Sequence, residues 1–255
     1  MYTLVDSHVH LDAEAFDADR AAVIARAGDA GIRHMIVPAT DRDSWPGIRD
    51  LCAGQPGIHP AYGLHPAFPD RHRPEHLDRL RQWLADNPAI AVGEIGLDFH
   101  QATWDRDLQQ RYFVDQLQLA RELDLPVIVH ARQALEEASL TLRRVGDLRG
   151  VVHSFSGSEQ QAKQLWDIGF HLGIGGSVTH SRAQRLRRIV ASMPIGFLLL
   201  ESDAPDQPDA AHRGQRNEPA RITEVLRCVA VLRGEPEDRV AEATTANARR
   251  LFGLD

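Results

Sequence analysis

Short apolar segments rich in β-branched residues alternate with longer amphipathic segments along the whole chain. Apolar segments with few polar interruptions are typical of strands that are buried on both faces of a parallel sheet. Regular alternation of such strands with helix-like segments predicts an α/β fold. The predicted strands are Leu4–His8, Arg33–Ala39, Ile58–Leu64, Ile90–Ile95, Pro126–His130, Gly150–Ser154, Phe170–Gly175 and Phe197–Glu201.

The segments between the strands repeat apolar residues at the three- and four-residue steps of amphipathic helices. The pattern is clearest at Asp105–Leu123, and a second helix is predicted over Ala13–Ala30. After the last strand, Asp203–Arg216 forms a long polar loop of the kind that often shapes a functional site. The tail, Glu218–Phe252, predicts two helices that separate near Gly234.

Eight strand–helix units in a chain of 255 residues match the size of a closed (β/α)8 TIM barrel. An open doubly wound sheet is the alternative, but that fold usually has fewer strands and places its site at one switch point. Here acids and histidines close many strands, and only a closed barrel brings so many strand ends to one rim. The sequence shows no linker, repeat or compositional break, so we expect a single domain over residues 1–255.

Histidines and carboxylates stand at or just beyond the ends of the apolar segments. The first two, His8 and His10, are two positions apart, a spacing that points both imidazoles to the same side of an extended strand. A lone histidine at a strand end is more often structural, but a repeated set with carboxylates is typical of divalent-metal sites. The predicted metal ligands are His8, His10, Glu94, His130, His153 and Asp203.

Further residues near these ligands are candidates for supporting roles. Asp98 either orients a ligand histidine or caps a helix, and Glu201 is either an acid behind the ligands or a weak ligand itself. Arg132 suits bidentate contact with phosphate, although an ordinary surface ion pair is its alternative role. The residues expected to contact substrate are His65, Arg132, His212 and Arg213.

Composition and charge narrow the class of protein. The formal net charge of −7 provides no general basic surface, but bound cations can reverse the local sign, so a polyanionic substrate is not excluded. The arginines of 182–188 are interpreted as a solvated helix face, with a nucleic-acid-binding track as the alternative. Cys52 and Cys228 are too few for a disulfide framework. With no basic leader or long apolar segment, we expect a cytoplasmic protein without a membrane association or an obligate protein partner.

Taken in order, the motifs of this chain resemble those of the TatD family of metal-dependent hydrolases, within the amidohydrolase-like barrels, and are most similar to its YjjV-type branch. The resemblance covers nearly the whole chain. Its motifs are Asp6–Leu11 (DSHVHL), Gly63–Pro66 (GLHP), Gly93–Asp98 (GEIGLD), Leu125–Arg132 (LPVIVHAR), His153–Gly157 (HSFSG), Leu200–Pro205 (LESDAP), Asn217–Pro219 (NEP) and Asn247–Phe252 (NARRLF).

This resemblance implies a TIM barrel with two divalent metal ions and a metal-dependent deoxyribonuclease activity, often exonucleolytic. It implies that Glu94 bridges the two metals, where many related barrels use a carboxylated lysine. The only lysine of this chain, Lys163, lies in a helical segment, which agrees with Glu94 as the bridge. The first metal would be held by His8, His10, Glu94 and Asp203, and the second by Glu94, His130 and His153.

We therefore expect a hydrolase that cleaves phosphodiester bonds of single-stranded DNA with a metal-activated water, Glu94 bridging the metals and Asp203 accepting the proton. Zn, Mn, Mg, Ni and Co all suit these ligands. The same centre could instead cleave another ester or amide, as in a D-aminoacyl-tRNA deacylase or a small-molecule phosphoesterase. A metal-binding scaffold without turnover is a further alternative.

Overall fold

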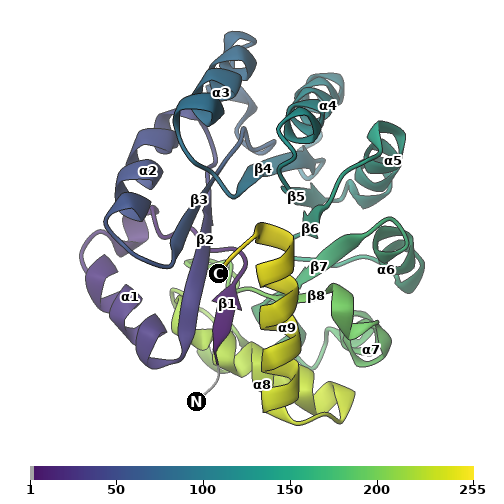
Figure 1. Ribbon diagram of the computed structural model, residues 1–255. Coiled ribbons are helices and arrows are strands. Elements are labelled where there is room, and N and C mark those ends of the chain that lie inside the picture. Colours follow the sequence, from purple (N-terminus) through teal and green to yellow (C-terminus); the bar gives the residue numbers. More distant parts are fainter. Residues whose placement is uncertain (1–2) are drawn as a thin grey trace.

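Eight parallel strands follow one another around a single sheet in chain order. The backbone N–H of Ser7 donates to the carbonyl of Leu200 (3.0 Å) and so links the first strand to the last. The strands thus form a nearly closed barrel with helices around it, and the predicted (β/α)8 class is confirmed (Figure 1). The strands are β1 (Leu4–Asp6), β2 (Ile32–Pro38), β3 (Ile58–Tyr62), β4 (Ala91–Asp98), β5 (Val127–Arg132), β6 (Gly150–Val152), β7 (Phe170–Ile174) and β8 (Leu198–Leu200).

This computed structural model describes residues 3–255, so the first two residues of the predicted domain lie outside the described part. Within that part, no helix is both long and apolar enough to cross a lipid bilayer. The α-helices are α1 (Arg20–Asp29), α2 (Trp45–Ala53), α3 (Glu75–Asp86), α4 (Arg106–Glu122), α5 (Leu135–Val145), α6 (Glu159–Trp166), α7 (Gln184–Ser192), α8 (Ile222–Arg233) and α9 (Glu237–Phe252).

The clearest helix predictions are confirmed. Helix α4 occupies the predicted segment, and the Asp105 side chain caps it by accepting a hydrogen bond from the Leu108 N–H (2.9 Å). The tail folds as α8 and α9, separated at Gly234, whose φ of 63° ends α8 in the left-handed conformation that glycine tolerates best.

The helix predicted over Ala13–Ala30 is wrong in its first part. Residues Glu14–Phe16 form a short 3-10 turn, and α1 begins only at Arg20. The Arg20 side chain donates hydrogen bonds to the carbonyls of Leu11 (2.6 Å) and Ala13 (3.3 Å). The preceding segment therefore folds around the guanidinium instead of continuing the helix.

Three strands, β1, β3 and β6, each end two residues earlier than predicted. Strand β1 stops at Asp6, because the Asp6 carboxylate accepts hydrogen bonds from the N–H groups of His8 (3.3 Å) and Ser202 (2.9 Å). Strand β3 stops at Tyr62, because the N–H of Leu64 donates to the side chain of Gln116 on α4 (2.8 Å) rather than to a neighbouring strand.

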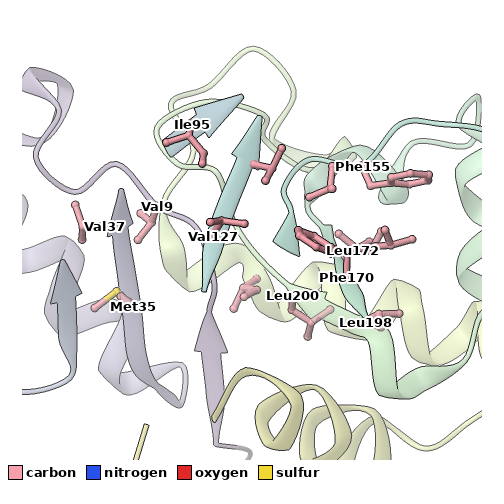
Figure 2. Packing of buried hydrophobic residues seen from close by; sticks show 14 of the residues in the cluster. Val9, Met35, Val37, Ile95, Val127, Phe155, Phe170, Leu172, Leu198 and Leu200 are labelled. Carbon is pink, nitrogen blue, oxygen red and sulfur yellow. The ribbon is translucent and has the colours of Figure 1, made fainter. Parts of the chain in front are cut away.

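Buried apolar side chains form two clusters on opposite faces of the sheet. The larger cluster packs the outer face against the helices, and Figure 2 shows part of it, with Phe170, Leu172, Leu198 and Leu200 from the adjacent strands β7 and β8. The smaller cluster fills the barrel, because successive residues of a strand point to opposite faces. Its buried members are Val5, Ile36, Ala61, Ala91, Ile128, Val151 and Leu199 from seven strands, with Ala248, Leu251 and Phe252 from α9.

Helix α9 therefore closes the amino-terminal end of the barrel, where it lies across the strands (Figure 1). Side-chain hydrogen bonds hold it there: Thr245 donates to the carbonyl of Thr3 (2.7 Å), and Asn247 donates to that of Leu198 (3.0 Å). The apolar interior thus lies toward α9, and the opposite, carboxyl end of the barrel is free to carry polar side chains.

An irregularity in β4 decides which of its side chains enter the barrel. Ala91 belongs to the inner cluster and Ile95 to the outer one. Between Val92 and Ile95 the strand advances three residues while β5 advances two, as at a β-bulge. The extra residue shifts the alternation of faces, so that Glu94 points into the barrel.

We expect Gly96→Ala to lower the free energy of unfolding by about 3 kcal/mol, through backbone strain and overcrowding. Gly96 has a φ of 141°, and a Cβ there would lie 2.0 Å from the carbonyl oxygen of His130. Urea denaturation measures the change. The control is Gly28→Ala in α1, where a Cβ meets nothing within 4 Å and a small gain in stability is expected. Equal stability of the two variants would contradict this account.

Candidate metal centre

The six predicted metal ligands lie together at the carboxyl end of the barrel. They come from β4 and β5 and from the segments that follow β1, β6 and β8. Five of them line an open cleft with a volume of about 770 Å³, and His8 is fully buried beneath it. The lining ligands are His10, Glu94, His130, His153 and Asp203.

Glu94 stands at the centre of this group, with only 1% of its surface exposed. Its Oε2 lies 3.2 Å from His8 Nε2 and 3.7 Å from His10 Nε2. The nitrogens nearest Oε1 are His65 Nε2 (3.0 Å), His130 Nδ1 (3.0 Å) and His153 Nε2 (2.7 Å). The two carboxylate oxygens therefore face separate groups of imidazoles.

Asp203 joins the group on the Oε2 side. Its Oδ1 lies 3.6 Å from His8 Nε2 and 3.8 Å from His10 Nε2, and these two nitrogens are 3.2 Å apart. Three sets of ligand atoms within 4.8 Å of one another could each hold a metal ion: His8, Glu94 and His153; His8, His10 and Asp203; and His65, Glu94 and His130. His65, predicted to contact substrate, thus also lies among the possible metal ligands.

The donor atoms fit a divalent cation. Glu94 Oε2 is buried and has no hydrogen-bond partner among the described residues, a situation that costs free energy unless another group satisfies the oxygen. It faces the ring nitrogens of His8 and His10, which are suitable ligands once deprotonated. A cation among these atoms would satisfy the oxygen and the nitrogens at once.

The pKa values of the imidazoles agree with this fit. Burial lowers the pKa of His8 to about 4 and that of His65 to about 4, so both are neutral near pH 7. Burial also opposes a charge on His153, but the Glu94 carboxylate outweighs it and raises the pKa of His153 to about 10. A cation would replace the proton of His153 as the partner of Glu94. Metal binding should therefore release a proton and strengthen as the pH rises.

Asp98 orients one of the candidate ligands. Its Oδ2 lies 3.0 Å from His130 Nε2, which places the ring proton there and leaves His130 Nδ1 to face Glu94. Its Oδ1 accepts a hydrogen bond from the N–H of His100 (2.8 Å). The following helix, α4, is capped by Asp105 instead, so the helix-capping role considered for Asp98 does not occur.

Glu201 is buried directly behind His153. Its Oε1 accepts a hydrogen bond from the N–H of Ser154 (2.6 Å) and lies 3.9 Å from His153 Nδ1. Gly173 makes room for it, since a Cβ there would lie 2.0 Å from Glu201 Oε2. Burial raises the pKa of Glu201 to about 8. Glu201 is outside the three sets of possible metal ligands, and its described hydrogen bond is to the backbone of Ser154.

The residues predicted to contact substrate are only partly brought together. Arg132 lines the cleft. His212 and Arg213 are absent from the residues that line it. His212 instead lies against Asp209, with its Nδ1 2.7 Å from Asp209 Oδ2. The cleft also contains Gln207, which no sequence pattern marked, because it is an ordinary polar residue in a loop.

We expect Asp98→Asn to weaken the binding of Zn²⁺ or Co²⁺ by about 10–100-fold, because an amide no longer fixes the orientation and basicity of His130. Titration calorimetry of metal-stripped protein measures the affinity. Asp105→Asn is the matched control: it removes the same charge at the N-cap of α4, where asparagine caps equally well. Unchanged affinity in Asp98→Asn would show that Asp98 does not support a ligand.

Comparison with known proteins identifies the family. Residues 5–253 match the family described as TatD related DNase. The chain is 39% identical over 253 residues to the uncharacterized metal-dependent hydrolase YjjV of Escherichia coli K12, covering 98% of both chains. The crystal structure of that TatD homolog matches with a TM-score of 0.95 at 37% identity, over 99% of this chain and 98% of the other.

Another relative carries a more specific name. It is the 3′-5′ ssDNA/RNA exonuclease TatD of Rahnella sp. strain Y9602, which is 33% identical over 268 residues, with 96% of this chain and 97% of the relative covered. The matches extend over nearly the full length of the chain in sequence and in structure. The chain therefore belongs to the TatD family and is a metal-dependent hydrolase.

Proposed function

We propose that this protein is an exonuclease that hydrolyses phosphodiester bonds of single-stranded DNA with the help of two divalent cations. The observation that carries the proposal is the position of Glu94, whose two oxygens face two separate groups of imidazoles. A shared carboxylate between two cations is an arrangement suited to displacement at phosphorus. The relative named as a single-stranded DNA and RNA exonuclease supports the choice of substrate.

The ligands divide between two positions around Glu94. When bound, two cations would lower the pKa of a water molecule and stabilise the negative charge that develops on the phosphate. The donor set suits Zn, Mn, Mg, Ni or Co. We propose that the first cation is held by His8, His10, Glu94 and Asp203, and the second by Glu94, His130 and His153.

The charges of the cleft explain why cations are needed. Three further acids, Asp12, Asp98 and Asp206, line it, and Arg132 is the one lysine or arginine among its described lining residues. A phosphate would be repelled by the carboxylates alone, whereas bound cations reverse the local sign. We propose that Arg132 then holds the phosphate through its planar guanidinium, and that His65 contacts substrate on the Oε1 side of Glu94.

The size of the cleft favours a chain end as substrate. The cleft has a volume of about 770 Å³, enough for a group the size of a single nucleotide, and it is open to solvent. Release of one terminal nucleotide at a time fits such a cleft.

The cytoplasmic location inferred from the sequence remains a prediction.

We expect Asp203→Asn to reduce kcat on single-stranded DNA by about 10²–10⁴-fold, because the amide cannot accept the proton of the attacking water. Thermal unfolding of the variant should stay close to that of the wild type, since Asp203 lies outside both apolar clusters. Steady-state kinetics and a melting curve test the two expectations together. A variant that kept most of its activity would exclude Asp203 as the proton acceptor.

The metal-dependent nuclease itself is tested by adding Mg²⁺, Mn²⁺, Co²⁺ or Zn²⁺ to metal-stripped protein and measuring mononucleotides released from single-stranded DNA. We expect release that depends on the metal and that Glu94→Ala abolishes, because the variant loses the group shared by both metal positions. Intact DNA with every metal would reject the nuclease. Aminoacyl-tRNA and small phosphoesters would then be the next substrates to test.

A further inference from the structure

Gln207, in the loop after β8, makes two hydrogen bonds through one amide nitrogen. Its Nε2 lies 2.5 Å from Asp203 Oδ2 and 2.6 Å from Ser154 Oγ. A primary amide carries two N–H donors on this nitrogen, and both are used here. Gln207 thereby connects the candidate proton acceptor to the residue that follows His153.

These contacts complete a closed set of interactions between the ends of β6 and β8. The backbone N–H of Ser154 donates to Glu201, while the Ser154 hydroxyl accepts from Gln207. Glu201 and Asp203 are two residues apart on the same segment. Two of the candidate ligands, His153 and Asp203, are therefore held relative to each other through Ser154, Glu201 and Gln207.

The backbone of Gln207 is itself fixed in place. Its carbonyl lies so close to Gly176 that a Cβ there would come within 2.3 Å of the carbonyl oxygen. Asn217 donates from Nδ2 to the carbonyls of Gln207 (3.4 Å) and Ser202 (2.8 Å). The Gln207 amide thus reaches Asp203 from a rigid base, which is what a residue that orients another side chain requires.

We propose that Gln207 is a positioning residue that orients the Asp203 carboxylate, so that one oxygen faces the metal and the other accepts the proton. Oδ1 faces His8 and His10, on the metal side. One lone pair of Oδ2 accepts a hydrogen bond from the Gln207 amide. The second lone pair of Oδ2 stays available for the proton of the attacking water. The role of Oδ2 as proton acceptor rests on the proposed function. The orientation of Asp203 toward the metal does not depend on it.

Without the amide, nothing in the described contacts would keep Oδ2 away from the metal side. The carboxylate could then turn and bind one cation with both oxygens, as carboxylates readily do. The proton acceptor would be lost to the metal, while Arg132 and His65, the proposed substrate contacts, would stay in place. The expected signature is a lower kcat with KM preserved, together with altered metal coordination.

The test compares Gln207→Met, which keeps the length of the side chain but has no donors, with Gln215→Met. Gln215 is an exposed residue of the same loop, so its variant is the matched control. Gln207→Leu, which also has no donors, is a second variant in case the first does not fold. Each protein is loaded with Co²⁺, its visible absorption spectrum is recorded, and kcat and KM are measured on single-stranded DNA.

We expect both Gln207 variants to lower kcat about 10–100-fold, the range for losing a hydrogen bond to a charged group, with KM changed less than about twofold. Their Co²⁺ absorption should weaken as the coordination number rises, and Gln215→Met should match the wild type in both measurements. Unchanged spectra and kcat would overturn the inference. So would a fall in kcat with an unchanged spectrum and a lower melting temperature, which would indicate a purely structural role.

The same experiment separates the two proposals. A wild-type protein that binds Co²⁺ but leaves DNA intact rejects the nuclease, and the spectra of the Gln207 variants still decide the inference about Asp203. If the spectra of the variants differ from that of the wild type while DNA is untouched, Gln207 positions Asp203 for a hydrolysis of another substrate. A wild-type protein that binds no Co²⁺ rejects both proposals.

Discussion

The buried charge of Glu94 is the interaction on which the carboxyl end of the barrel depends. An ionised carboxylate removed from water costs several kcal/mol unless charged or hydrogen-bonding groups compensate it. Here imidazoles surround it, and they hold the pKa of Glu94 well below its usual value against the opposing effect of burial. Those imidazoles come from four different strand ends, so the closed barrel is the condition for the site. Because Glu94 Oε2 has no hydrogen-bond partner among the described residues, the site is also suited to divalent cations.

The amino end of the barrel has an apolar interior and the carboxyl end a polar one, so the first contributes to stability and the second carries the candidate metal ligands. Toward the amino end, residues from seven strands and α9 form a closed apolar cluster, which supplies the hydrophobic contribution to stability. Toward the carboxyl end, buried carboxylates and histidines stand in place of apolar side chains, and their burial costs free energy unless their charges are compensated. Glycines such as Gly96 and Gly173 let strands and carboxylates approach there more closely than a side chain would allow.

A second layer of polar groups holds the candidate ligands. Asp98 orients His130, Glu201 supports the turn after His153, and Gln207 contacts Asp203. Each supporting group acts on one ligand from outside the cluster, and such outer contacts commonly set the affinity and reactivity of a metal site. The substrate, in contrast, would meet the rim of the cleft, where Arg132 and the loop after β8 lie.

The sequence by itself determined the strand order, the barrel class and the side chains that gather at the carboxyl rim, because strand periodicity and strand ends are local features. It did not determine that Glu94 faces inward: counting alternate positions from Ala91 points it outward, and only the irregularity against β5 reverses this. It also placed His212 and Arg213 in the site and gave no sign of Gln207. The course of the loop after β8 depends on contacts with Gly176, Ser154 and Asn217, which are distant in sequence or across the loop, and no local pattern encodes such contacts.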